Sequence, residues 1–311
     1  MTPIPEYPVG TRIDLDATGT WPASVHRFDA DTAAALRAAE AAGRPLLIRG
    51  DPGTGKSQTA RAAAAAAGRL FLSVTIDGRT EAHDLLWHHD AIARLSDAQA
   101  NAAQEPAHYL TPGPLWWAYD WSTAEQQWGQ RKQTDVPTRP PGWTEAKGTV
   151  LLIDEIDKAD PDLPNAFLEL LGNQGFTVPH LAKTIRGQRP PLVVITTNEE
   201  RELPNAFLRR CLVRTLGLPR DLAPWLVEMG ELHLARLDLA ERCFQPVLRQ
   251  AAGQLLADRA RAEGDQRYAP GLAEYLDLVI ALARLGADQP AQEALLKDIA
   301  KFALCKSADR P

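Results

Sequence analysis

Cysteine is scarce in this chain, and long apolar runs and an excess of positive charge are absent. Cys211, Cys243 and Cys305 are widely spaced and form no C-x-x-C pair, which argues against a disulfide framework and a zinc site. No run of eighteen apolar residues occurs, and the proline-rich start has no basic-then-apolar leader pattern, so we expect neither a membrane span nor a secretory signal. We therefore expect a cytoplasmic protein whose cysteines are reduced and mostly packed.

The charge balance excludes a general electrostatic attraction to polyanions. The chain has 34 Lys and Arg against 40 Asp and Glu, a net charge of -6, so neither nucleic acid nor an anionic membrane attracts it as a whole. A local basic patch is not excluded. With 311 residues, 45% hydrophobic and 24% charged, the chain is long enough for two soluble domains with a sizeable core.

Residues 45–60, PLLIRGDPGTGKSQTA, are predicted to form a phosphate-binding loop between a buried strand and a helix. They satisfy the spacing G-x-x-x-x-G-K-[ST], in which successive backbone N–H groups and the first helical turn point at phosphate oxygens. The lysine supplies a positive charge and the serine hydroxyl a magnesium ligand. The predicted nucleotide-binding residues are Gly50, Asp51, Pro52, Gly53, Thr54, Gly55, Lys56, Ser57 and Gln58.

Four short apolar runs predict buried strands, and polar residues follow two of them. The runs are 46–48, 70–76, 149–153 and 192–197. Asp154 and Glu155 follow the third run and Asn198 follows the fourth. Acids at the carboxyl end of a central strand lie at the mouth of an open α/β sheet, where ligands bind. The amide of Asn198 is placed to orient water near a γ-phosphate.

Helices are predicted around these strands and throughout the last third of the chain. One should begin at about Asp31, which offers an acidic N-cap, and stop at Gly43. The phosphate-loop helix should close at Gly68, and another helix should span 160–172. A short one should end at Arg209 and Arg210. From Pro219 onward the pattern is helical, with one apolar face carrying Leu272, Leu276, Val279 and Ala283.

Three other features leave alternatives open. Five tryptophans lie in residues 77–148, where they either pack an insertion onto the core or form a partner surface. Lys183, Arg186 and Arg189 form either a solvated loop or a hairpin that faces a pore. Three histidines lie close to two aspartates, but the spacing of the histidines gives no i, i+4 pair, so we expect no metal there. The tryptophans are Trp116, Trp117, Trp121, Trp128 and Trp143, and the other group is His83, His88, His89, Asp84 and Asp90.

Taken in order, these motifs resemble those of an AAA+ ATPase. The resemblance rests on the phosphate loop, LLIDEID, VVITTN, an arginine pair and a helical C-terminal region. It covers about residues 28–303. Residues 80–86, GPLWWA and NEERELPNAFLRRC are similar to the MoxR and CoxD-like branch, close to the dynein-related group. The implied fold is an α/β P-loop NTPase, a three-layer sandwich with a central parallel sheet, followed by a small all-α lid domain.

The resemblance implies a role for each site residue in binding ATP and Mg²⁺ and in hydrolysis. Lys56 would contact the β- and γ-phosphates, while Ser57 and Asp154 would hold the metal, Asp154 through water. Glu155 would polarise the attacking water, and Asn198 corresponds to sensor 1. Arg210 is our choice for the finger that reaches a neighbouring subunit, with Arg209 as the alternative. Because that arginine comes in trans, a homo-oligomer is expected, commonly a hexameric ring in this superfamily.

One position departs from the branch pattern. Where relatives carry a sensor 2 arginine, this chain reads YAPGLAEY with Gly271, and Arg267 just upstream is the possible substitute. Loss of sensor 2 would weaken lid closure on the γ-phosphate. The resemblance therefore implies slow or partner-stimulated ATP hydrolysis.

The expected organisation is an arm or linker at 1–27, a nucleotide-binding domain at 28–217 with an insertion at 77–148, and a lid domain at 218–311. The leading hypothesis is a MoxR-like, chaperone-type remodelling ATPase that acts on a separately encoded protein partner. One alternative is a nucleic-acid-dependent motor subunit, against which the net acidity weighs. The other is a nucleotide-gated scaffold with little turnover, which Gly271 motivates.

Overall fold

The computed structural model describes residues 3–102, 104–129, 136–160, 163, 175–187, 189–264 and 269–304. The chain divides into two compact units. The α/β unit comprises Met1–Ile13, Arg27–Gly50 and Lys56–Thr215. The helical unit comprises Asp14–His26, Asp51–Gly55 and Leu216–Pro311.

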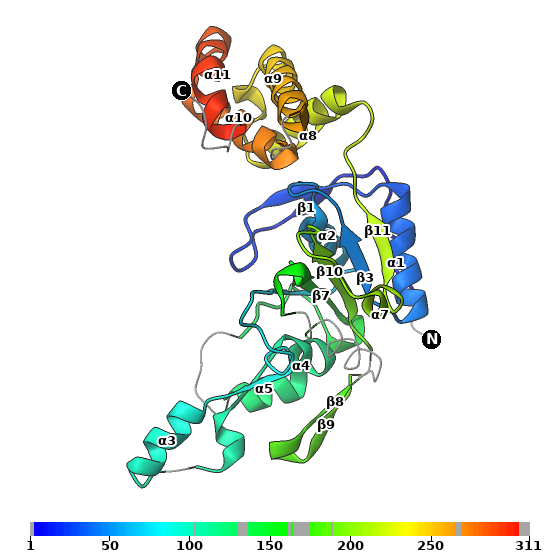
Figure 1. The fold of residues 1–311 in the computed structure, drawn as a ribbon, viewed down its shortest axis with the longest axis vertical. Coiled ribbons are helices and arrows are strands. Elements are labelled where there is room, and N and C mark those ends of the chain that lie inside the picture. The colour runs from blue at the N-terminus through cyan, green and yellow to red at the C-terminus, as the bar shows by residue number, and fades with distance from the viewer. Residues whose placement is uncertain are drawn as a thin grey trace. The chain divides into compact units, whose positions relative to one another are not determined.

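A five-stranded parallel sheet forms the centre of the α/β unit (Figure 1). Its order is β11-β3-β10-β7-β4, so the two most apolar strands, β7 and β10, lie inside the sheet. Every residue of β10 and all but the last residue of β7 are buried, as a sheet covered by helices on both faces requires. The strands are β3 (Leu46–Arg49), β4 (Leu70–Thr75), β7 (Thr149–Asp154), β10 (Leu192–Thr197) and β11 (Leu212–Thr215).

The fifth strand, β11, is an edge strand that the sequence interpretation did not predict. Its four residues, LVRT, alternate between half-buried and exposed positions. It pairs with β3 in parallel register, and α1 (Ala30–Ala42) packs along it. The backbone groups on the outer edge of β3 therefore find their partners in a strand with weak local propensity.

The predicted first helix exists, but its N-cap is Asp29 and not Asp31. The Asp29 carboxylate accepts the Thr32 backbone N–H at 2.8 Å, whereas Asp31 lies inside the first turn. Gly43 ends the helix in the left-handed conformation, with φ 60°. The helix begins earlier than expected because Asp29 also receives the Thr32 hydroxyl and the Arg214 guanidinium.

Helix α2 (Lys56–Ala66) follows the phosphate loop and packs on β4 and β7. Gly68 closes it with φ 60°, as predicted. The short helix α7 (Asn205–Leu208) ends immediately before Arg209 and Arg210. The helix predicted over 160–172 lies almost wholly outside the described residues.

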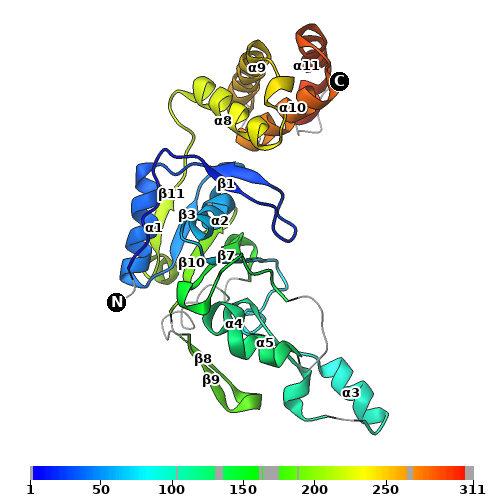
Figure 2. The same cartoon turned by 180° about the vertical axis from the view of Figure 1, so that it is seen from behind.

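The insertion between β4 and β7 consists of short elements, of which α4 packs on β4 and β7 while α3 extends away from the sheet (Figure 2). Trp116, Trp117 and Trp121 are at most 4% exposed, and Trp128 and Trp143 pack against the same cluster, so packing accounts for these rings. The elements are β5 (Trp87–His89), α3 (Ala91–Gln99), β6 (Leu110–Pro112), α4 (Pro114–Tyr119) and α5 (Trp121–Gly129).

Of the basic group, Lys183 lies on a hairpin strand, whereas Arg186 and Arg189 follow that strand in irregular backbone. β8 (Phe176–Val178) pairs antiparallel with β9 (Lys183–Ile185). Lys183 is exposed on β9, and Arg186 is exposed just beyond it. Lys183 and Arg186 are thus solvated, while Arg189 is half-buried.

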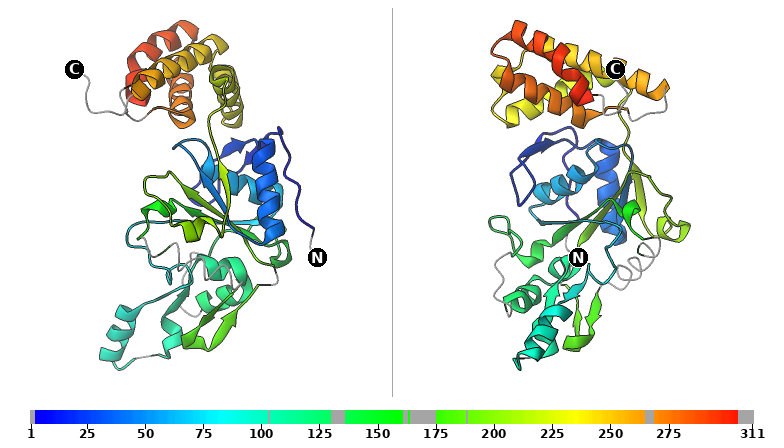
Figure 3. Two further views of the ribbon diagram at one scale, coloured as in Figure 1. Left: turned by 45° about the vertical axis from the view of Figure 1, so that its right-hand side comes forward. Right: turned by 60° about the vertical axis from the view of Figure 1, so that its left-hand side comes forward.

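The helical unit has its own apolar core (Figure 3). Its buried positions on α10 are Tyr275, Leu278, Val279, Leu282 and Ala283, while Leu272 and Leu276 of the predicted stripe are half-buried. The helices are α8 (Leu222–Arg236), α9 (Gln245–Gly264), α10 (Leu272–Leu285) and α11 (Gln289–Leu304), and the unit also holds the paired strands β1 (Ile13–Leu15) and β2 (Ser24–His26).

Two cysteines are free and buried, as expected from the sequence. Burial raises the pKa of the Cys211 thiol to about 12 and that of Cys243 to about 11. Cys305 lies outside the described residues. Among the helices that the structure describes, none combines the length and apolar character needed to cross a bilayer.

Candidate nucleotide site

The phosphate loop depends on three glycines with positive φ. Gly50, Gly53 and Gly55 have φ of 140°, 76° and 87°, values that residues with a Cβ rarely adopt. Lys56 begins α2 and is only 7% exposed, and its Nζ donates to the Gly50 carbonyl at 2.7 Å. The ammonium is thus held over the loop, where it can neutralise phosphate charge.

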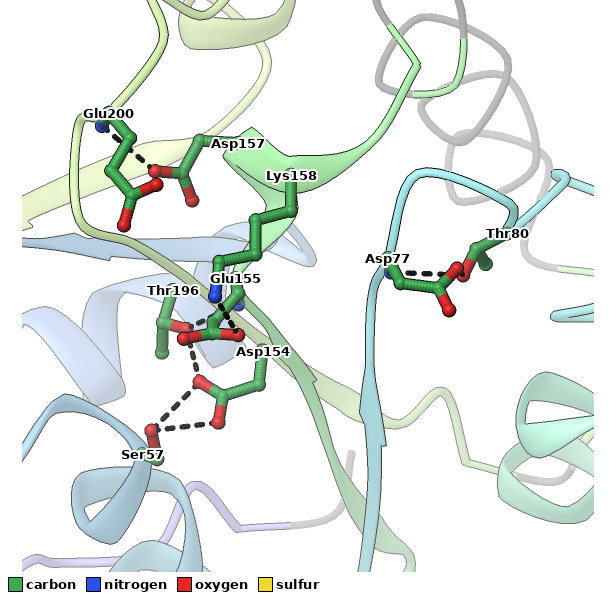
Figure 4. A network of polar contacts seen from close by, with 9 residues as sticks. All are labelled: Ser57, Asp77, Thr80, Asp154, Glu155, Asp157, Lys158, Thr196 and Glu200. Atoms are coloured by element: carbon green, nitrogen blue, oxygen red, sulfur yellow. Dashed lines mark hydrogen bonds and ion pairs between the residues drawn. The ribbon is translucent and has the colours of Figure 1, made fainter.

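Ser57 and Asp154 meet although 97 residues separate them in the sequence (Figure 4). The Ser57 hydroxyl donates to both carboxylate oxygens of Asp154, at 2.8 and 3.0 Å. The meeting follows from topology, because parallel strands β3 and β7 both end at this edge of the sheet. Hydroxyl and carboxylate oxygens are the ligands that Mg²⁺ prefers, so this pair fits a magnesium ion.

Thr196 is a residue of the candidate site that the sequence interpretation missed. Its hydroxyl donates to Asp154 Oδ1 and accepts the backbone N–H of Glu155 at 3.0 Å. Thr196 is 1% exposed, so its hydroxyl replaces solvent for both groups. The pattern could have revealed it, since Ile195 pairs with Ile153 in register and the next residues on the two strands are therefore neighbours.

Glu155 is held in an unusual conformation at the end of β7. Its backbone is left-handed, with φ 61° and ψ 47°, which is uncommon outside glycine and is typical of functional sites. Its carboxylate accepts the Lys158 ammonium at 2.8 Å. That hydrogen bond is the main reason that the pKa of Lys158 is raised, although partial desolvation opposes it.

Asn198 follows β10 directly and therefore lies at the same sheet edge as Asp154. It is half-buried, and within the described residues its side chain has no hydrogen-bond partner. The loop beyond it is fixed by backbone bonds: Glu199 donates to the Thr197 hydroxyl at 2.9 Å, and Glu200 donates to the buried Asp157 at 3.0 Å. The structure thus brings Lys56, Ser57, Asp154, Glu155 and Asn198 to one edge.

Arg209 and Arg210 do not join this cluster. Both are exposed at the end of α7, and the Arg210 guanidinium contacts only the Ala206 carbonyl, at 3.5 Å, among the described residues. Neither forms an ion pair there. Gly271, in the helical unit, is the N-cap of α10, and its N–H donates to Glu274 at 2.9 Å. Arg267, the suggested substitute for sensor 2, lies outside the described residues.

A family model of the AAA domain, dynein-related subfamily, matches residues 45–211. This match covers more than half of the chain and contains the glycine loop, the acidic strand end and Asn198. The chain therefore belongs to this family and is an ATP-binding P-loop protein of the AAA ATPase class. The prediction of an AAA+ protein close to the dynein-related group is confirmed.

Structures of NtrX show the same fold at low sequence identity. NtrX from Brucella abortus is 16% identical with a TM-score of 0.51, over 83% of this chain and 51% of NtrX. NtrX in complex with ADP is also 16% identical, with a TM-score of 0.51 over 85% of this chain and 52% of NtrX. A Cytophaga hutchinsonii protein assigned as an ATPase is 14% identical, with a TM-score of 0.40 over 88% and 80%. The chain thus spans about half the length of NtrX.

A search of curated proteins gave no match to the chain.

Proposed function

We propose that this protein is a Mg²⁺-dependent, MoxR-like AAA+ ATPase that forms a ring and remodels a separately encoded protein partner. The observation that carries the proposal is the cluster in which Ser57 and Thr196 hold Asp154 while Thr196 holds the Glu155 amide. These groups supply a metal ligand and a base beside the phosphate loop.

The proposed roles follow from the chemistry of the side chains. Lys56 and the loop N–H groups bind phosphate, and Ser57 and Asp154 hold Mg²⁺. The metal, when bound, offsets the charge on the phosphate oxygens. Glu155 takes a proton from the attacking water, and Asn198 orients that water. All five are assigned from position and chemistry.

A ring is proposed because Arg209 and Arg210 are exposed and contact neither the phosphate loop nor Asp154 among the described residues. Phosphoryl transfer develops charge that an arginine supplied in trans can stabilise, contributing roughly three to five orders of magnitude in rate. Arg210 and Arg209 are exposed and free of ion pairs within the described residues, so either can reach an adjacent subunit. Arg210 is the first choice.

Slow basal turnover is part of the proposal. Lys158 occupies the Glu155 carboxylate, and Gly271 supplies no cation at the start of α10. Engagement of a partner would then accelerate hydrolysis. A protein partner is favoured over nucleic acid by the net charge of -6.

The test is an ATPase assay with mass measurement on wild type, Glu155→Gln and Arg210→Ala. Wild type should hydrolyse ATP with Mg²⁺ and form oligomers with nucleotide. Glu155→Gln should retain nucleotide-dependent thermal stabilisation but lose hydrolysis, and Arg210→Ala should lose hydrolysis without losing binding. Stimulation by DNA or RNA would instead favour the nucleic-acid motor. ATP binding by a monomer that never hydrolyses would leave only the nucleotide-gated scaffold.

A further inference from the structure

A cavity of about 200 Å³ lies in the α/β unit away from the phosphate loop. Its walls come from α4 and α5, the segment before β7, and the segment after β9. Figures 1 and 2 both show α4 and α5 beside the β8–β9 hairpin. The side chains that the argument uses are Trp121, Trp143, Asp120, Glu145, Arg186 and Arg189.

The cavity is separate from the nucleotide site because the two lie at opposite ends of β7. Gly148 and Thr149, where β7 begins, line the cavity. Asp154, where β7 ends, belongs to the metal-binding pair. At about 3.3 Å per residue, the strand separates the two places by roughly 16 Å.

The walls are rigid, so the cavity is preformed. The Trp117 and Trp121 rings lie 4.7 Å apart between centroids, and Trp143 lies 5.4 Å from Trp121. Trp143 Nε1 donates to the Gly148 carbonyl at 2.9 Å. A Cβ at Gly187 would collide with the Tyr119 carbonyl oxygen, so only glycine allows this approach. A preformed site loses little entropy on binding.

One arginine of the wall has no acid partner among the described residues. Arg186 is exposed and forms no ion pair within the described residues, whereas Arg189 is held by Glu40 and the Lys147 carbonyl. An arginine on the cavity that lacks an acid partner can pair with the oxyanion of a ligand.

Two carboxylates restrict which oxyanion fits. One oxygen of Asp120 accepts from Ser122 and Thr123, and one oxygen of Glu145 accepts the Ser122 N–H at 2.6 Å. The second oxygen of each carboxylate is available to N–H donors. These acids repel a phosphate dianion more strongly than a carboxylate, because the repulsion scales with charge. A ligand that carries a carboxylate together with amide N–H groups can pair with Arg186 and also donate to Asp120 and Glu145.

We propose that this cavity binds a short peptide segment that bears a carboxylate, either a free chain end or an acidic side chain, from the protein partner. Arg186 pairs with the carboxylate, Asp120 and Glu145 receive peptide N–H groups, and Trp143 contacts the apolar part. The inference rests on the protein-partner arm of the proposed function and extends it with a place of attachment.

The test measures fluorescence anisotropy with fluorescein-labelled random pentapeptide pools on the full chain. One pool has free carboxyl termini, a second is amidated but contains Asp or Glu, and a third is amidated and neutral. One of the first two should bind wild type and thereby identify the source of the carboxylate. Arg186→Gln should weaken that binding at least tenfold, the effect of losing about 1.4 kcal/mol from a charge-assisted bond.

The control is Arg284→Gln, the same charge change at an exposed position of α10 in the helical unit, which should bind like wild type. Equal binding of all three pools, no binding at millimolar peptide, or binding unchanged by Arg186→Gln would overturn the proposal. Binding of labelled oligo(dT) in place of the peptides would also overturn it and favour nucleic acid. Basal ATPase activity, measured without peptide, tests the proposed function separately, because Arg186 lies outside the nucleotide site.

Discussion

At the scale of single residues, Thr196 shows how one hydroxyl can organise two carboxyl-bearing residues. It gives its proton to Asp154 and receives the amide proton of Glu155. Removing the hydroxyl would leave the Glu155 N–H without its acceptor, and the Asp154 oxygen would keep only the hydrogen bond from Ser57. Both losses act on the same proposed chemistry, since Asp154 holds the metal and the Glu155 amide fixes the position of the base.

Replacing Thr196 with Val should weaken both stability and hydrolysis. We expect a loss of about 1–3 kcal/mol in the free energy of unfolding, the cost of an unsatisfied buried group. We also expect a roughly 10- to 100-fold loss of Mg²⁺-dependent ATPase activity, as for other residues that orient metal ligands. Denaturant titration and a steady-state ATPase assay measure the two effects.

Thr196→Ser is the matched control, because it keeps the hydroxyl and removes only a methyl group. It should retain most of the activity. An equal loss in Ser and Val variants would show that the methyl group, and not the hydrogen bonds, supports the site.

Lys158 restrains Glu155 through an exposed ion pair, so its removal should speed basal hydrolysis. Pairs of this kind contribute up to about 1 kcal/mol, which corresponds to a two- to fivefold rise in basal kcat for Lys158→Ala. The measured quantity is ATP turnover without partner, with KM recorded alongside.

Lys158→Arg should keep the ion pair and leave turnover near that of wild type. If Lys158→Ala lowers kcat instead, Lys158 assists the reaction and does not restrain it.

At the scale of elements, the first helix shows where a cap is set by tertiary contacts. Asp29 caps α1 and also meets Arg214 of β11, at 3.1 Å. Burial, the largest single effect, raises the pKa of Asp29, but the hydrogen bonds from Thr32 and the charge of Arg214 outweigh it, and the pKa is lowered overall from 3.8. The cap thus ties α1 to the edge strand.

Asp29→Ala should cost about 1 kcal/mol of unfolding free energy at neutral pH. Because the folded-state pKa is depressed, this contribution is complete above pH 3.8 and is lost as the pH falls through the folded value. The difference between Asp29→Ala and wild type should therefore shrink below pH 3.8. Denaturant titrations at several pH values measure it.

Asp31→Ala is the control, since Asp31 has the same charge in the same turn but does not cap the helix. It should cost a few tenths of a kcal/mol. A larger loss for Asp31→Ala than for Asp29→Ala would contradict the assignment of the cap.

At the scale of the whole molecule, the proposed ring makes two inactive variants complementary. Glu155→Gln keeps its arginine, and Arg210→Ala keeps its base. In a random equimolar mixture about one quarter of interfaces would join an intact site to an intact arginine. Mixing should therefore restore a substantial part of the hydrolysis that each variant lacks alone.

The control is a mixture of Glu155→Gln with the double variant Arg210→Ala/Glu155→Gln. No subunit in this mixture has an intact base, so it should stay inactive. Absence of activity in the first mixture, with mixed oligomers shown by mass measurement, would show that Arg210 does not act across an interface. Arg209→Ala tests the alternative arginine in the same way.

The sequence by itself determined the elements whose signals are local. A glycine pattern before a lysine favours positive φ wherever the loop folds, and four consecutive apolar residues at 150–153 are typical of a strand buried on both faces. The order of the motifs along the chain was equally readable. The class of protein and the central sheet could therefore be predicted.

Only the tertiary structure decided which distant groups meet. The pairing of β11 with β3, the choice of Asp29 over Asp31, and the two bonds of Thr196 depend on neighbours more than forty residues away. The cavity beside Trp121 is also assembled from separate segments. A local sequence pattern determines which interactions a residue can form. Tertiary packing determines which partner it meets, because contact energies depend on neighbours that sequence spacing does not specify.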